Sequence, residues 1–111
     1  ISAWSGVVYE YAFGTEKPAL FIDVPIKINN PNYKDLGIEP VDIKLRGRIG
    51  MVFDLQNIGN VDSAVDELIK NRDKHKDEII KARSEFVYNF GNSSEAGAKY
   101  IYNFCKDNKD A

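Results

Sequence analysis

The apolar run ALFIDV, residues 19–24, constrains the fold of this chain more than any other feature of the sequence. It is rich in β-branched and aromatic residues, opens after Pro18 and closes at Pro25, which is typical of a short strand buried on both faces. Buried strands of this kind occur in parallel sheets, where each strand needs neighbours that run the same way. Because the remaining sequence contains few strand candidates, we expect half of an α/β domain.

The residues around this strand predict short elements and one long loop. Apolar spacing predicts a helix over residues 6–14, with Gly14 near its C-terminal stop. Residues 25–40 are rich in Pro and Asn and predict a loop. The alternation VDIKL at 41–45 suggests an exposed strand, although a short helical turn also fits. Residues 49–53 predict a second short strand.

The second half of the sequence predicts three helices. The first begins at Asn60, a suitable N-cap residue, and a break near Asp73 separates it from the second. The third begins after Asn92, where Glu95 is spaced to reach back as in a capping box. We expect residues 106–111 to form a frayed tail.

Composition and charge exclude several classes of protein. The chain has 111 residues, 43% hydrophobic and 29% charged, which fits one globular domain. Its net charge of −2 provides no basic surface field, so nucleic acid is not an expected partner. Its apolar runs are far shorter than the roughly 20 residues needed to span a membrane.

Several residues that could bind a ligand or take part in catalysis also have a purely structural interpretation. Cys105 is the single cysteine, and its apolar helical context predicts a small buried hydrophobic residue. His75 is the single histidine, lies among charged residues and has no second metal ligand at suitable spacing, so we expect it to be solvated. Arg46 and Arg48 could meet phosphate, but a solvated face is the preferred interpretation. Residues 29–33 could border a ligand site or form only a surface loop.

The opening sequence ISAWSGVVYEYA places a Ser-Gly turn before an apolar helix. The first amides of a helix have no internal acceptors and carry the positive end of the helix dipole, so they can bind phosphate. Gly6 would let a ligand approach the backbone, and Ser5 adds a hydroxyl donor. Glu10 lies about one turn further on, where its carboxylate could bind ribose hydroxyls. Alone, the pattern favours an ordinary helix cap over a phosphate site.

Two stretches of the chain resemble a known family. WSGVVYEYAFGTEKPALFID, together with the tail FVYNFGNSSEAGAKYI, is similar to the C-terminal part of the CDP-glycerol glycerophosphotransferases, which make teichoic-acid-type surface polymers. The matches cover residues 1–24 and 86–101. The resemblance implies a GT-B enzyme, with this chain forming the C-terminal portion of its Rossmann-like nucleotide-binding domain: few parallel strands followed by three helices. The upstream part of the enzyme would then lie outside residues 1–111.

The resemblance also assigns roles to individual residues. Ser5, Gly6 and Val7 would hold the donor diphosphate, and Glu10 would hold the ribose. The family's usual Asp is replaced by Ala3, and an Arg found in some members is replaced by Ala96, so neither position receives a role. The family's catalytic histidines lie upstream of this chain, and we therefore expect the segment alone to be inactive, with no catalytic residue of its own.

The expected function is transfer of glycerol phosphate, or a similar polyol phosphate, from a CDP-activated donor to a lipid-linked cell-surface polymer. No cofactor or metal is expected. The resemblance implies a cytoplasmic enzyme peripheral to the inner face of the cell membrane. A sugar-nucleotide glycosyltransferase or epimerase of the same fold remains an alternative, as does a non-catalytic interaction domain. Exposed strand edges would allow two copies to pair.

Overall fold

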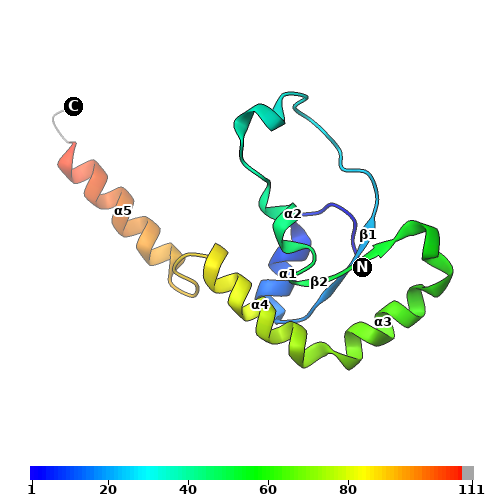
Figure 1. The fold of residues 1–111 in the computed structure, drawn as a ribbon. Helices are drawn as coiled ribbons and strands as arrows, with labels where there is room; N and C mark the ends of the chain where they lie inside the picture. The colour runs from blue at the N-terminus through cyan, green and yellow to red at the C-terminus, as the bar shows by residue number, and fades with distance from the viewer. Residues whose placement is uncertain (109–111) are drawn as a thin grey trace.

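The computed structural model describes residues 1–108, which combine helices with a small parallel sheet (Figure 1). The elements in chain order are α1 (Val7–Thr15), β1 (Ala19–Asp23), η1 (Tyr33–Leu36), α2 (Val41–Leu45), β2 (Gly50–Asp54), η2 (Leu55–Asn60), α3 (Val61–Lys70), α4 (Arg72–Phe86) and α5 (Ser93–Asp107), with η marking 3₁₀ turns. The chain therefore has a mixed α/β fold, and the predictions of β1, β2, α1, α3, α4 and α5 are confirmed in kind.

The sheet is parallel, and the apolar run at residues 19–24 supplies its strand β1. β1 and β2 pair in parallel with Ala19 opposite Gly50 and Asp23 opposite Asp54. On the other edge of β1, Ser2 forms an isolated parallel bridge with Phe21. A short third segment therefore lies beside β1, and α1 connects it to β1 as a parallel crossover.

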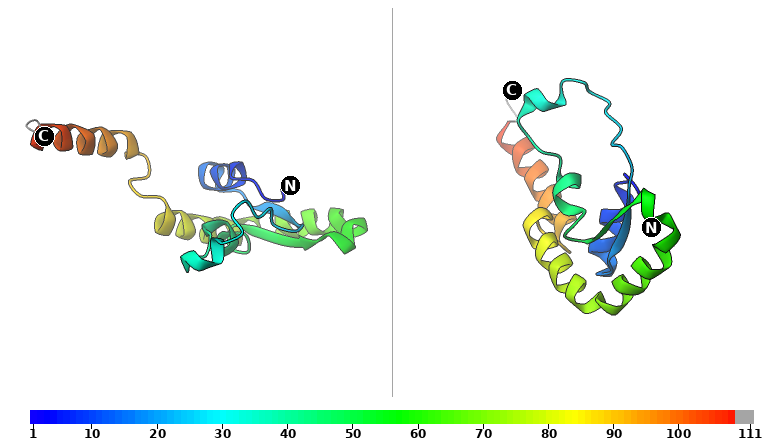
Figure 2. Two further views of the ribbon diagram at one scale, coloured as in Figure 1. Left: turned by 90° about the horizontal axis from the view of Figure 1, so that it is seen from above. Right: turned by 45° about the vertical axis from the view of Figure 1, so that its right-hand side comes forward.

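Helices cover both faces of this sheet (Figure 2). Alternate residues of a strand point to opposite faces, and Phe21 packs with α1 and α4 while Leu20 packs with α3. One cluster comprises Val8, Ala12, Ala19, Phe21, Leu45, Ile49, Ile79 and Ala82, and the other Leu20, Ala64 and Leu68. The result is a three-layer arrangement, which accounts for the apolar residues on both sides of β1.

The segment VDIKL forms the short helix α2, so the preferred prediction of a strand is wrong. Pro40 occupies the N-cap position, and Asp42 lies in the first turn, where the helix dipole favours a negative charge. Only Leu45 of this helix is buried, against the α1 and α4 side of the sheet. A helix can bury one residue in five, whereas a strand would direct alternate residues to the same face.

The end of α1 differs from its prediction, whereas the break between α3 and α4 lies close to the predicted one. Gly14 lies inside α1, and the left-handed residue that ends this helix is Glu16, with φ of 57°. The carboxylate of Glu16 is held by Arg83 and Lys76, each at 3.0 Å, which offsets the conformational cost of that position. The break between α3 and α4 falls at Asn71, close to the predicted position near Asp73.

The predicted side-chain caps at two helix starts are not formed. Neither Asn60 before α3 nor Asn92 before α5 makes a side-chain cap hydrogen bond. The side chain that does cap in this region is Asp54, which accepts a hydrogen bond from the Gln56 amide at 2.9 Å. Asp54 therefore caps the 3₁₀ turn η2, which follows β2 directly and continues into α3. The side-chain cap expected of Asn60 is made one element earlier, by Asp54.

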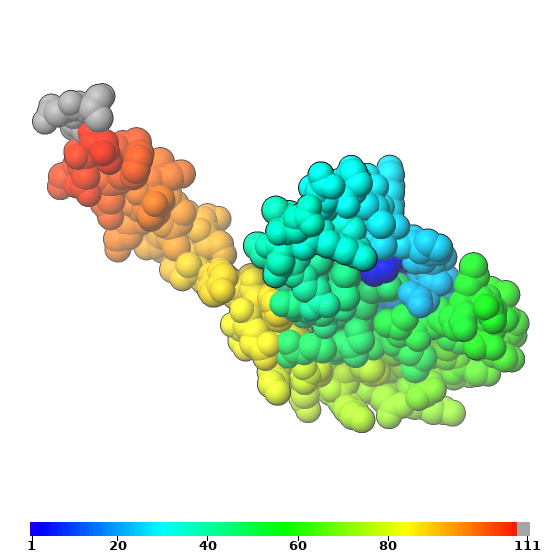
Figure 3. Space-filling view, turned by 45° about the horizontal axis from the view of Figure 1, so that its top comes forward, coloured from blue at the N-terminus to red at the C-terminus, as the bar shows by residue number. Residues whose placement is uncertain are grey.

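The helix α5 projects away from the rest of the molecule (Figure 3). None of its residues is buried, so the prediction that Cys105 is a buried hydrophobic residue is wrong. The helix continues through Asp107, while a frayed tail over residues 106–111 stays a prediction, since residues 109–111 lie outside the described part. Within residues 1–108, no helix combines the length and apolar content needed to cross a membrane.

Candidate functional site

The loop before α1 lies at the carboxyl end of β1. The indole Nε1 of Trp4 donates a hydrogen bond to the carbonyl oxygen of Val24, directly after β1, at 2.7 Å. This bond, together with the Ser2 bridge to Phe21, fixes the loop across the end of the strand. Ligands of open α/β sheets bind outside the carboxyl ends of the strands. The predicted diphosphate residues therefore lie where such a fold can bind a ligand.

The predicted phosphate-binding residues are accessible. Ser5, Gly6 and Val7 are all exposed. The helix begins with the amides of Val8 and Tyr9 donating to the carbonyls of Ser5 and Gly6, at 3.4 and 3.0 Å. The preceding amides, those of Gly6 and Val7, have no acceptor one turn earlier in the helix and are free to meet an anion.

The backbone conformation and surroundings of Gly6 show whether the fold itself requires a glycine there. Its φ of −61° is available to any residue, and a Cβ added there would meet nothing within 4 Å. Neither backbone conformation nor packing therefore requires a glycine at this position. The open space beside Gly6 is available to a ligand.

Glu10, the predicted ribose-binding residue, is exposed on α1. It lies four residues after Gly6 and therefore on the same side of the helix, one turn further along. Among the ion pairs of the described residues, none involves Glu10. Its carboxylate is thus available to accept hydrogen bonds from hydroxyl groups.

A buried arginine supports the loop, and sequence reasoning missed it. Arg46 follows α2 and is 6% exposed, so its interpretation as part of a solvated face is wrong. Its guanidinium carbon lies 3.8 Å from the centre of the Trp4 ring, and it pairs with Asp23 at 3.2 Å. It also donates to the carbonyl of Ile22 at 3.1 Å. The guanidinium therefore ties the Trp4 loop to the end of β1.

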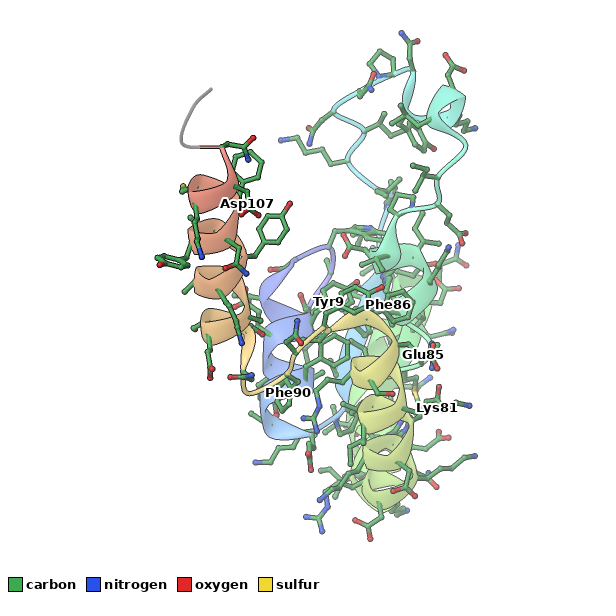
Figure 4. All side chains as sticks on the ribbon, turned by 90° about the vertical axis from the view of Figure 1, so that its left-hand side faces the viewer. Tyr9, Lys81, Glu85, Phe86, Phe90 and Asp107 are labelled. Carbon is green, nitrogen blue, oxygen red and sulfur yellow. The ribbon has the colours of Figure 1, made fainter. Side chains whose placement is uncertain are left out.

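Arg48 is committed to another interaction and is not available for phosphate. Its guanidinium donates to Glu78 at 2.7 Å and to both carboxylate oxygens of Glu85 at 2.7 and 3.0 Å. These hydrogen bonds raise the pKa of Arg48, and the bonds from Arg48 lower the pKa of Glu85. Glu85 lies on α4 (Figure 4). The prediction of a solvated Arg48 face is therefore corrected to an ion-pair network that holds α4 beside the start of β2.

Tyr9 is the aromatic residue of α1 that bears on the site. Its ring packs with Phe21 at a centroid distance of 6.2 Å, and Figure 4 shows it near Phe86 of α4. Its hydroxyl donates to the carbonyl of Asp42 at 3.1 Å. Burial, followed by the charge of Asp42, raises the pKa of Tyr9 to about 12. This hydroxyl therefore stays protonated at neutral pH and acts as a hydrogen-bond donor within the fold.

The proline-rich loop after β1 forms a small hollow near the same end of the sheet. Its volume is about 160 Å³, and its lining includes Asn29, Asn30 and Tyr33 from the predicted site-bordering segment. The side-chain oxygen of Asn30 accepts a hydrogen bond from the Asn32 amide at 3.0 Å, which shapes the turn. This geometry is explained by the loop itself, and a ligand contact for residues 29–33 stays a prediction.

A larger groove of about 540 Å³ lies beside the edge of β1 that faces away from β2. It is lined by Ile1, Ser2, Val7, Val8, Tyr11, Lys17, Pro18, Ala19, Leu20, Val65, Leu68, Ile69 and Arg72. Of the four predicted donor-binding residues, only Val7 contributes to it. The lining is mostly apolar, with Lys17 and Arg72 as its charged members.

His75, the single histidine of the chain, lies on α4. It is half-buried on α4 rather than fully solvated, which corrects the prediction, and burial followed by the charge of Lys74 lowers its pKa. In residues 1–108, no group of three or more His, Cys, Asp or Glu side chains is placed to hold a metal ion.

Comparison with known proteins adds no relative. No protein-family model matches the chain, and neither the curated proteins nor the solved structures contain a significant match.

Proposed function

We propose that this chain is the C-terminal donor-binding part of a transferase that moves glycerol phosphate, or a related polyol phosphate, from a CDP-activated donor to a surface polymer. The observation that carries this proposal is the exposed start of α1, fixed at the carboxyl end of a parallel strand by Trp4 and Ser2. In this proposal the domain is Rossmann-like and belongs to a GT-B enzyme. The lipid-linked acceptor and peripheral membrane attachment are parts of the same proposal.

The proposed roles follow from the chemistry of the loop. The amides of Gly6 and Val7, with the hydroxyl of Ser5, bind the donor diphosphate, and the helix dipole favours its negative charge. Glu10 accepts hydrogen bonds from the ribose. These groups position the leaving group and stabilise the charge that develops on it. The group that activates the acceptor hydroxyl comes from outside residues 1–111, so this chain binds the donor but does not turn it over.

An amide NMR titration with CDP tests the proposal. UDP and inorganic phosphate serve as controls. We expect shifts concentrated at Ser5, Gly6, Val7 and Glu10, and larger for CDP than for UDP. Equal shifts with CDP and UDP would favour the sugar-nucleotide alternative, and equal shifts with phosphate would leave only an anion site at a helix end. Absence of any response at α1 would contradict donor binding by this chain.

Two substitutions sharpen the titration. Gly6→Ala fits the fold without contact, so it should leave stability unchanged while its methyl group obstructs the anion and weakens CDP binding about tenfold, roughly 1.4 kcal/mol. Gly59→Ala, which also meets open space, is the matched control and should bind as the original chain does. Glu10→Gln should weaken CDP binding but leave phosphate binding unchanged, and Glu39→Gln should change neither.

A non-catalytic interaction domain is the second candidate, and α5 is the observation that favours it. Tyr100, Ile101 and Phe104 are between 59% and 73% exposed on this helix. Their spacing places them on one side of α5, as in helices that dock in apolar grooves. Loss of the acidic residue at Ala3 also fits this alternative. A CDP titration without response, combined with self-association that depends on α5, would support it.

A further inference from the structure

The outer edge of β1 is only partly paired. Ser2 donates its amide to the Leu20 carbonyl at 2.8 Å and accepts from the Ile22 amide at 2.7 Å. In a parallel ladder, alternate residues direct their backbone groups to opposite edges. Ala19 donates to Ile49 on the β2 side at 3.2 Å, so the amide of Leu20 faces the Ser2 side. No acceptor for this amide lies within the backbone pairs of residues 1–108.

The 540 Å³ groove lies along this same partly paired edge. Val7, Val8 and Tyr11 of α1 line it on one face of the sheet, and Val65, Leu68 and Ile69 of α3 line it on the other face. Pro18, Ala19 and Leu20 form its base along β1. The groove therefore has an apolar wall on each side of a strand edge, which is the space that another strand of the sheet would occupy.

The Ser2 bridge fixes the direction and register of such a strand. Because Ser2 lies opposite Phe21, a continuation towards the N-terminus places Ile1 opposite Leu20 and the residue before Ile1 opposite Ala19. The amide of Leu20 would then donate to the carbonyl of the residue that precedes Ile1. Ile1 already lines the groove, so the path leads directly from Ser2 along its base.

We propose that this groove binds a β-strand formed by polypeptide immediately N-terminal to Ile1, parallel to β1 and apolar on both of its faces. Both faces must be apolar because α1 covers one side of the groove and α3 covers the other. The strand would remove the exposed apolar lining from water and satisfy the Leu20 amide. This proposal concerns an interaction surface and does not depend on nucleotide binding.

Hydrogen exchange of the Leu20 amide tests the proposal. Three forms of the chain carry a four-residue N-terminal extension: Val-Ile-Val-Ile, Val-Ser-Val-Ser or Gly-Ser-Gly-Ser. We expect the first to slow exchange at Leu20 at least tenfold, the second to slow it less, and the third to leave it as in residues 1–111 alone. The Ile22 amide, already bonded to Ser2, is the internal control and should be protected in all three forms.

Two results would overturn the proposal. Equal exchange of Leu20 in all three forms would show that the groove does not take a strand in this register. Protection of Leu20 in residues 1–111 alone that increases with protein concentration would assign the groove to a second copy of the chain. Because none of these measurements uses a nucleotide, a failed CDP titration would leave this test intact.

Discussion

Arg46 joins three groups at the carboxyl end of β1. Its planar guanidinium stacks on Trp4 and reaches both the carboxylate of Asp23 and the carbonyl of Ile22. The Nε atom of the same group is buried without a hydrogen-bond partner in the described residues. Since an unsatisfied buried donor is costly, the remaining contacts of Arg46 must offset that cost. A lysine could not reproduce this stacked, forked geometry.

His75 should make stability depend on pH. Because its folded-state pKa lies below the usual value near 6.5, the unfolded chain takes up a proton at this site before the folded chain does. The free energy of unfolding should therefore fall as pH drops from 7 through 6.5, with the loss continuing to the lower folded-state pKa. Urea unfolding at a series of pH values measures this slope.

The control for the pH dependence is His75→Gln. The variant should lose the slope above pH 6, because His75 is the single histidine of the chain. Lys74, which lowers the His75 pKa, and Glu67, which raises it, supply the surrounding charges. A slope unchanged by the substitution would show that another group titrates in this range.

Individual side chains were the hardest feature to predict from the sequence. Arg46 contacts Trp4 and Asp23, which lie 42 and 23 positions away, and no local pattern reveals such a contact. The prediction of burial for Cys105 was wrong because its apolar neighbours in the sequence suggested a packed helix, whereas no described residue of α5 is buried. The helix start after Ser5 and Gly6 was easier to predict, because it is a local feature with a clear pattern, while the ligand roles of Ser5, Gly6 and Glu10 stay predictions.

At the scale of elements, Gly50 is the position in β2 where an added side chain would collide with β1. A Cβ at this position would lie 1.8 Å from the carbonyl oxygen of Ala19, which is backbone and cannot turn aside. Gly50→Ala should therefore separate the first pair of the parallel ladder and cost about 3 kcal/mol of stability. Gly47→Ala, where the added methyl group meets open space, should change stability by less than about 0.5 kcal/mol.

Urea unfolding of the two glycine variants provides the measurement. Similar stabilities for both would mean that the strands tolerate a wider separation at Gly50. A loss of this pairing would affect both apolar clusters, because β1 contributes residues to the cluster on each face of the sheet.

The elements that the sequence predicted well are those with a strong local pattern. The compact apolar run of β1 and the apolar stripe of α3 required no knowledge of distant contacts. The helix α2 was mistaken for a strand because five residues are too few to separate the two periods, and a tertiary contact of Leu45 decided the outcome. The end of α1 lies beyond the predicted stop at Gly14, at Glu16, whose carboxylate pairs with Arg83.

At the scale of the whole molecule, the chain divides into a layered body and a projecting helix. Figure 4 places Asp107 near the outer end of α5, well away from the labelled residues of the body. The radius of gyration is 18.3 Å, whereas a compact domain of this length is expected near 13 Å. The helix α5 therefore contributes to shape more than to packing.

Removal of residues 92–111 should leave the body folded. No residue of α5 is buried, so the body should lose less than about 1 kcal/mol in urea unfolding. The cut leaves Phe90 in place, and this side chain stacks on Arg83 at 4.1 Å. Removal from residue 88 onward, which also takes away Phe90, provides the contrasting variant and should be less stable. A large loss from the shorter deletion would mean that α5 packs against the body in solution.

The projecting helix also has a consequence for rotational motion. A molecule with extents of 64 × 37 × 18 Å does not tumble equally about all axes in water. Rotation about the long axis is faster than rotation of that axis itself, so amide bonds aligned with it reorient more slowly than those across it. Nitrogen-15 relaxation in α5 should therefore differ from relaxation in β1 even where both are equally rigid, and the ratio would report how firmly the helix is held to the body.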